Sequence, residues 1–195
     1  MKETAGTVGA LILAAGFSRR FGHVKLRAGL QNGSTVFAQT LARIAAATPN
    51  VLVVTRSDLV DIAQVAEHLG ITTVSCPDAQ LGMGHTIAFG MQRIPDWDAC
   101  LVCLGDMPFI RTDTYGELLA AMRSDVITIP QHEGQTGNPV GFCRLFFPAL
   151  RLVQGDTGGR DVLQANREHV RQVPVCDPAI FQDIDTPEDL ARLQL

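Results

Sequence analysis

Small and cationic residues gather in one stretch near the start of the chain, residues 8–25, VGALILAAGFSRRFGHVK. Its first part, 8–13, is an aliphatic run that predicts a short strand buried on both faces. Three small residues follow, Ala14, Ala15 and Gly16, and then polar and cationic ones: Ser18, Arg19, Arg20 and Lys25. Small side chains let a ligand approach backbone N–H groups, which can form a concave anion site. Arginine and lysine add charge-assisted hydrogen bonds, so the stretch predicts a phosphate site.

Two familiar phosphate loops do not fit this stretch. The P-loop requires Gly-Lys-Ser/Thr, whereas Gly22 is followed by His23. The dinucleotide fingerprint requires Gly-x-Gly-x-x-Gly, and Ala14 stands at the first of those glycines. The alternative to a phosphate site is a tight turn after a strand, with Arg19 and Arg20 solvated.

A second candidate for chemistry is Asp106 in the segment Leu-Gly-Asp-Met-Pro, which follows the apolar run 99–104. A carboxylate at the end of a buried strand is placed where a divalent ion could bridge protein and phosphates. Mg²⁺ prefers one or two carboxylates together with phosphate oxygens and water. The alternative is a turn residue, because Asp and Pro are common in turns.

The elements that must position these residues alternate along the chain. Strands are expected at 8–13, 50–55, 71–75, 99–104, 126–130, 140–143 and 170–175. Helices are expected from an N-cap at Ser34 to 47, at 58–69 and 83–94, from an N-cap at Thr112 to 123, and at 145–152 and 159–166. This pattern predicts an α/β fold, a Rossmann-like three-layer sandwich with a mostly parallel sheet, over one domain spanning 1–195. Ligands of such folds bind at the carboxyl ends of the strands, where Gly16, Gly82 and Gly105 lie.

Bulk properties exclude several functional classes. The formal net charge is -4 and no basic stripe occurs, so nucleic acid is not an expected partner. The apolar run near the start is too short to span a bilayer, and Glu3 precedes it where a signal peptide carries positive charge. We therefore expect a cytoplasmic protein with no membrane contact. Five cysteines argue against a disulfide framework, and Cys100 and Cys103 point to opposite faces of a strand, as packing residues would.

The first stretch reads Leu-Ala-Ala-Gly-x-Ser-x-Arg-x-Gly-x-x-Lys, which resembles the signature of nucleotidyltransferases that transfer a nucleoside monophosphate. It is most similar to the MobA-like NTP transferases of the molybdenum cofactor, especially their cytidylyltransferase branch, which have a nucleotide-diphospho-sugar transferase-type fold. The resemblance runs from Leu11 to Leu190 and implies catalytic roles for Arg20, Lys25 and Asp106. The nucleotide-binding residues that it implies are Leu13, Ala14, Ala15, Gly16, Ser18, Arg20, Lys25, Gly82, Met83 and Asp106.

The resemblance also implies a Mg²⁺ site and an acceptor site. Asp106 and, from the family's Asp-Thr-Pro-x-Asp-Leu segment, Asp185 would hold the metal; Thr186 and Asp189 already read as a capping box. The Gly-x-Pro turn and the Gly-Asp-x-Gly-x-Arg stretch would face the acceptor through Asn138, Pro139, Gly158 and Arg160. Asn138 stands where the family has His, and both segments could equally be ordinary loops. His85 lies in the segment where the family has serines. It could be a surface residue at a helix start or a functional residue.

These implications give a function. The chain would be a Mg²⁺-dependent enzyme that transfers CMP from CTP to the phosphate of molybdopterin, releasing pyrophosphate, with transient contact to a molybdoenzyme or its chaperone. CTP is favoured because Ala15 replaces a glycine of the guanylate-transferring branch, and its methyl narrows the loop. The alternatives are GTP or another phosphorylated acceptor on the same fold, and a nucleotide-binding protein without turnover. Retention of Lys25, Asp106 and Asp185 favours an enzyme.

Overall fold

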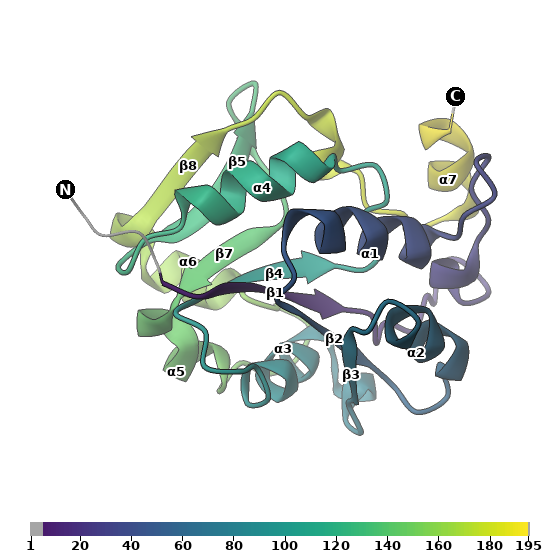
Figure 1. Ribbon diagram of the computed structural model, residues 1–195, viewed down its shortest axis with the longest axis horizontal. Helices are drawn as coiled ribbons and strands as arrows, with labels where there is room; N and C mark the ends of the chain where they lie inside the picture. Colours follow the sequence, from purple (N-terminus) through teal and green to yellow (C-terminus); the bar gives the residue numbers. More distant parts are fainter. Residues whose placement is uncertain (1–5, 195) are drawn as a thin grey trace.

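A mixed, mostly parallel sheet forms the centre of the computed structural model, which describes residues 6–194 (Figure 1). The strands run in the order β3-β2-β1-β4-β7-β5-β6, and β8 pairs with β5. Their bounds are β1 Val8–Leu13, β2 Val51–Thr55, β3 Thr72–Ser75, β4 Ala99–Leu104, β5 Ile127–His132, β6 Gln135–Thr136, β7 Val140–Cys143 and β8 Val170–Pro174. β1, β2, β3 and β4 are parallel neighbours, whereas β7 is antiparallel to both β4 and β5. The expected α/β fold is confirmed.

Helices cover both faces of this sheet (Figure 1). The first face carries α1 Val36–Ala47, α2 Val60–Glu67 and α4 Thr112–Ala121. The second carries α3 Met83–Met91, α5 Phe147–Leu150 and α6 Arg160–Ala165, and α7 Pro187–Leu193 lies near the end of the chain. Single 3-10 turns add Lys25–Arg27, Ala79–Leu81, Arg144–Phe146, Arg167–His169 and Pro178–Phe181. The helices are shorter than the sequence pattern indicates, and β6 is too short to show a period.

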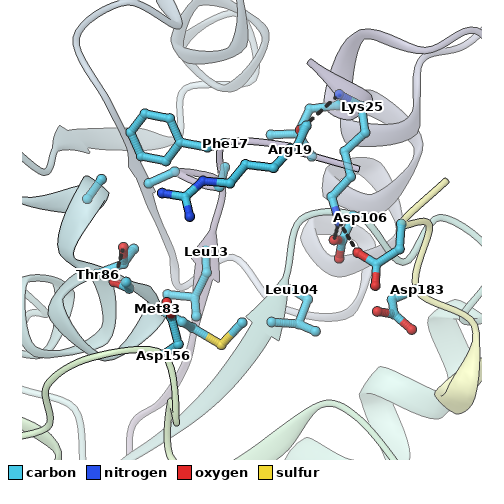
Figure 2. Close-up of a pocket in the computed structure, with 18 of the residues that line it drawn as sticks. Leu13, Phe17, Arg19, Lys25, Met83, Thr86, Leu104, Asp106, Asp156 and Asp183 are labelled. Atoms are coloured by element: carbon cyan, nitrogen blue, oxygen red, sulfur yellow. Dashed lines mark hydrogen bonds and ion pairs between the residues drawn. The ribbon is translucent and has the colours of Figure 1, made fainter. Parts of the chain in front are cut away.

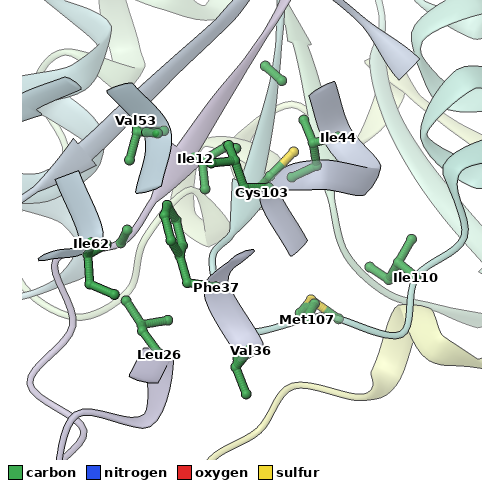
Figure 3. Close-up of a cluster of buried hydrophobic side chains, with 14 of the residues drawn as sticks. Ile12, Leu26, Val36, Phe37, Ile44, Val53, Ile62, Cys103, Met107 and Ile110 are labelled. Carbon is green, nitrogen blue, oxygen red and sulfur yellow. The ribbon is translucent and has the colours of Figure 1, made fainter. Parts of the chain in front are cut away.

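Each central strand contributes side chains to two separate cores. In β1, Ile12 packs beneath α1 while Leu11 packs beneath α3, because successive side chains of a strand point to opposite faces. Figure 3 shows the first of these cores, with Ile12 and Phe37 side by side. Cys100 and Cys103 fall in different cores, as expected, and burial raises the pKa of Cys100 to about 12. The two cysteines are therefore packing residues.

Two of the expected helix caps are wrong. Thr35, not Ser34, caps α1: its extended backbone places the hydroxyl to accept from Ala38 N at 3.2 Å. The Ser34 hydroxyl instead donates to the Thr35 carbonyl. Thr112 is the first residue of α4 and not its N-cap. The N-cap position is held by Arg111, whose side chain makes no capping hydrogen bond.

A residue far along the chain holds the start of α4. The buried Asp177 carboxylate accepts from Arg111 N at 2.9 Å and from the Thr114 hydroxyl at 2.6 Å. A cap supplied from such a distance leaves no local pattern in the sequence. Within residues 6–194, no helix is both long and apolar enough to cross a bilayer.

Candidate active site

A cavity of about 470 Å³ opens at the carboxyl ends of β1 and β4 (Figure 2). The two strands are parallel and in register, with Leu13 beside Leu104, so the segments that follow them meet at one edge of the sheet. The Gly105 amide donates to the Leu13 carbonyl at 3.0 Å and ties these segments together. The cavity is lined by Leu13, Ala14, Ala15, Gly16, Phe17, Ser18, Arg19, Arg20, Lys25, Leu26, Ala79, Gln80, Gly82, Met83, Thr86, Leu104, Asp106, Asp156, Asp183 and Asp185.

Residues 14–24, which we call the β1 loop, contribute one wall of this cavity through residues 14–20. Ala14 remains tied to the sheet, because its amide donates to the Val54 carbonyl at 2.7 Å. Ser18 adopts a positive φ of 51°, and its hydroxyl accepts from the Lys25 amide at 3.1 Å. This local bond closes the loop and brings Lys25 back over the end of β4. The ten residues expected to bind nucleotide all line the cavity.

Lys25 stands between two carboxylates. Its Nζ lies 2.5 Å from Asp106 Oδ2 and 2.9 Å from Asp185 Oδ1, and all three side chains are less than a third exposed. Burial works against the charged ammonium, but the charge and hydrogen bonds of Asp106 and Asp185 outweigh it and raise the pKa of Lys25. Arg20, which is 72% exposed, donates to Asp185 Oδ2 at 2.6 Å. The lysine is thus fully charged at neutral pH and is held at the cavity floor.

The segment before α7 delivers the acidic residues from the far end of the chain. The Ile184 amide donates to the Asp106 carbonyl at 3.1 Å, which fixes this segment against the end of β4. Thr186 and Asp189 form the expected capping box of α7. Desolvation opposes ionisation of Asp185, but Lys25 and Arg20 outweigh it and lower its pKa.

Asp183 is a cavity residue that the sequence analysis missed. It lies two residues before Asp185 and also lines the cavity (Figure 2). Partial desolvation and the negative charges of Asp106 and Asp185 raise its pKa. The signal was present, because the segment reads Asp-Ile-Asp and alternate residues of an extended segment face the same side.

These carboxylates fit a Mg²⁺ ion that arrives with phosphates. Asp106 Oδ1 is buried and has no hydrogen-bond partner among residues 6–194. In the same range no three His, Cys, Asp or Glu side chains are placed to hold a metal on their own. Mg²⁺ needs only one or two carboxylates when phosphate oxygens and water complete its octahedron. The orphaned oxygen of Asp106, with Asp185 beside it, meets that requirement.

Close backbone contacts place the segment that begins at Gly82. The Gly84 amide donates to the Gly155 carbonyl at 2.7 Å, and the Gly155 amide donates to His85 Nδ1 at 3.2 Å. A Cβ at Gly82 would lie 2.4 Å from Asp156 Oδ1, and the φ of Gly82 is +116°, so only glycine fits there. His85 therefore has a structural role in holding the 155 loop. Asp156 follows Gly155 in this loop and lines the cavity, although the sequence patterns did not single it out as a site residue.

The four residues expected to bind the acceptor lie outside the lining of this cavity. The Asn138 amide donates to the Ile180 carbonyl at 2.9 Å, and the buried Pro139 follows it. Gly158 packs against Met83, a lining residue, with only 3.0 Å between the Met83 Sδ and a Cβ built at Gly158. Arg160 begins α6 and is exposed. Their roles toward an acceptor stay predictions.

Comparison with known proteins gives matches over most of the chain. The sequence profile of the MobA-like NTP transferase domain matches residues 10–172. The purine catabolism protein PucB of Bacillus subtilis (strain 168) is 25% identical over 189 residues, which are 92% of this chain and 92% of PucB.

Solved structures share the fold. Rv0371c from Mycobacterium tuberculosis H37Rv superposes with a TM-score of 0.85 at 24% identity, covering 98% of this chain and 99% of that one. The same protein in complex with manganese gives a TM-score of 0.81 at 22% identity, with coverage of 97% and 98%. Molybdopterin-guanine dinucleotide biosynthesis protein A from Archaeoglobus fulgidus gives 0.65 at 19% identity, with coverage of 95% and 96%. At these identities the likeness is one of fold.

Proposed function

Because this chain belongs to the family of MobA-like NTP transferase domains, we propose that it transfers CMP from CTP to the phosphate of a molybdopterin-type acceptor and releases pyrophosphate. The family makes it a nucleotidyltransferase. The cytidylyl and molybdopterin assignments are our inference. The observation that most supports nucleotidyl transfer is the cavity that joins the β1 loop, Lys25 and the carboxylates of Asp106, Asp183 and Asp185 at one sheet edge.

The reaction that this cavity suits is an in-line displacement. An oxygen of the acceptor phosphate forms a bond to the α-phosphorus, and the bond from that phosphorus to the α,β-bridging oxygen breaks. Pyrophosphate leaves with the electron pair. Positioning and charge neutralisation carry most of the catalysis of such transfers, and no protein nucleophile is needed.

The chain's own residues supply that positioning and charge. We assign the triphosphate to the amides of the β1 loop and to the Arg20 and Lys25 side chains, which line one cavity. Asp106 and Asp185 would hold Mg²⁺, which supplies charge neutralisation at the phosphates when bound. The manganese complex of Rv0371c supports the use of a divalent ion within this fold.

The preference for CTP rests on the β1 loop. Ala15 is buried and lines the cavity, so its methyl takes up room that a glycine would leave to the base. The similarity to molybdopterin-guanine dinucleotide biosynthesis protein A of Archaeoglobus fulgidus supports the acceptor class, although the name of that protein contains guanine and not cytosine.

A panel of nucleotides against acceptors tests this proposal. Pyrophosphate release is measured with CTP, GTP, ATP and UTP, each with molybdopterin, with molybdenum-loaded molybdopterin, and without acceptor, at fixed MgCl₂. We expect release with CTP that depends on the acceptor and is abolished by EDTA. Equal or faster release with GTP would contradict the base assignment, and acceptor-independent release would contradict the transfer.

A further inference from the structure

Arg56 lies directly behind the β1 loop, at the end of β2, and is outside the cavity lining. Its Nη1 donates to the Gly16 carbonyl at 2.7 Å and to the Ala15 carbonyl at 3.4 Å. The other side of the guanidinium is held by Asp58, with bonds of 2.7 and 3.1 Å from Nε and Nη2. The Arg56 side chain is only 10% exposed. One guanidinium thus joins the start of the α2 segment to two consecutive loop carbonyls.

Arg56 also supports an aromatic ring of the same loop. Its Cζ lies 4.0 Å from the centroid of the Phe17 ring, a cation–π distance. Phe17 is 43% exposed and lines the cavity, so one side of its ring is covered by the guanidinium while the residue borders the ligand space. Arg56 therefore contacts both the backbone of the β1 loop and the Phe17 side chain, although Arg56 itself does not line the cavity.

The geometry of the peptide bond relates these carbonyl contacts to the direction of the neighbouring N–H groups. In a planar trans peptide the N–H points opposite to the C=O of the same unit. The Ala15 and Gly16 carbonyls face Arg56, so the amides of Gly16 and Phe17 point away from it, and both of these residues line the cavity. Neither amide donates a hydrogen bond to any of residues 6–194. Two N–H groups that have no acceptor among residues 6–194, on residues that line the cavity, are ready donors for an anion.

We propose that Arg56 is a positioning residue, which orients the β1 loop so that the Gly16 and Phe17 amides bind the triphosphate. This inference rests on the proposed function, since it assigns the phosphates to that wall. A charged donor makes stronger bonds to carbonyls than a neutral one, and a guanidinium can serve two carbonyls and a carboxylate at once. A lysine at this position could satisfy only part of that set.

The test compares Arg56→Met and Arg56→Lys with Arg144→Met as a matched control. Arg144 makes a similar ion pair, 2.6 Å from Asp96 Oδ1, and lies at the opposite edge of the sheet, beside the start of β4. Binding of CTP with MgCl₂ is measured by calorimetry, and kinetics are measured with the acceptor. We expect Arg56→Met to raise the Kd and KM for CTP about tenfold while kcat changes less than threefold, because the amides bind ground state and transition state alike.

The outcomes separate this inference from the proposed function. Arg56→Lys should fall between wild type and Arg56→Met, and it remains informative if the methionine variant does not fold. Arg144→Met should stay within twofold of wild type. If wild type binds CTP and the Arg56 variants bind it as tightly as Arg144→Met does, the positioning role of Arg56 is overturned and the proposed function is not. A wild type that binds no nucleoside triphosphate would instead overturn the proposed function, and the role of Arg56 with it.

Discussion

Replacing Lys25 by methionine should tighten the binding of a bare divalent cation. The ammonium lies 2.5 Å from Asp106 Oδ2 and 2.9 Å from Asp185 Oδ1, the same two carboxylates that we assign to Mg²⁺. Without nucleotide, Lys25 therefore competes with the metal. Methionine keeps most of the stem's length and removes the charge.

The expected size of this effect follows from the charges. Two unit charges about 4 Å apart interact by about 4 kcal/mol at an effective dielectric constant near 20. The substitution recovers only part of this interaction energy, because in wild type the lysine can swing toward solvent when the ion arrives. We expect Mn²⁺ to bind at least about tenfold more tightly, corresponding to about 1.4 kcal/mol.

Free Mn²⁺ is measured by electron paramagnetic resonance during titration of the nucleotide-free protein. Lys25→Met is compared with wild type and with Lys25→Met/Asp106→Asn, which should lose the gain. Unchanged or weaker Mn²⁺ binding in Lys25→Met would refute the competition. With nucleotide present, Lys25→Ala should lower kcat more than it raises KM, because the ammonium then pairs with charge that develops in the transition state.

Three further substitutions test separate parts of the site. Asp106→Asn should lower kcat by about 100-fold or more while the protein stays folded, measured by pyrophosphate release and circular dichroism; near-normal turnover would contradict the metal assignment. Ala15→Gly should reduce the preference for CTP over GTP in kcat/KM by about 1–3 kcal/mol, and an unchanged ratio would remove the steric explanation. Asp183→Asn should raise Tm at pH 7, because a carboxylate whose pKa is raised by folding costs stability above that pKa; the gain should shrink as the pH falls toward about 3.9, and a lower Tm at pH 7 would contradict it.

The sequence predicted the parts of the site that follow buried strands. An aliphatic run that ends in small residues places the β1 loop, and Ala99–Leu104 places Asp106, because a parallel sheet brings such ends to one edge. The fold class follows from the alternation of strands and helices. Both inferences rely on local patterns, which a single sequence displays.

Contacts between distant segments could not be predicted in the same way. Arg20 and Asp185 are 165 positions apart, and only a resemblance to a known family connected them. Arg56 supports the β1 loop through a backbone carbonyl, and Asp156 follows Gly155, which is bonded to Gly84 and His85; neither contact leaves a pattern of residue types. The cap that Asp177 gives to α4 was missed for the same reason.

The fate of each phosphate of CTP tests nucleotidyl transfer most directly. The enzyme is incubated with MgCl₂, acceptor and CTP labelled with ³²P at either the α- or the γ-position, and the products are separated by chromatography. The α-label should appear in the acceptor product and the γ-label in pyrophosphate, because the bond that breaks lies between the α-phosphorus and the bridging oxygen. A γ-label in the acceptor product would show phosphoryl transfer, and an α-label recovered only as free CMP would show hydrolysis; either result would contradict the account.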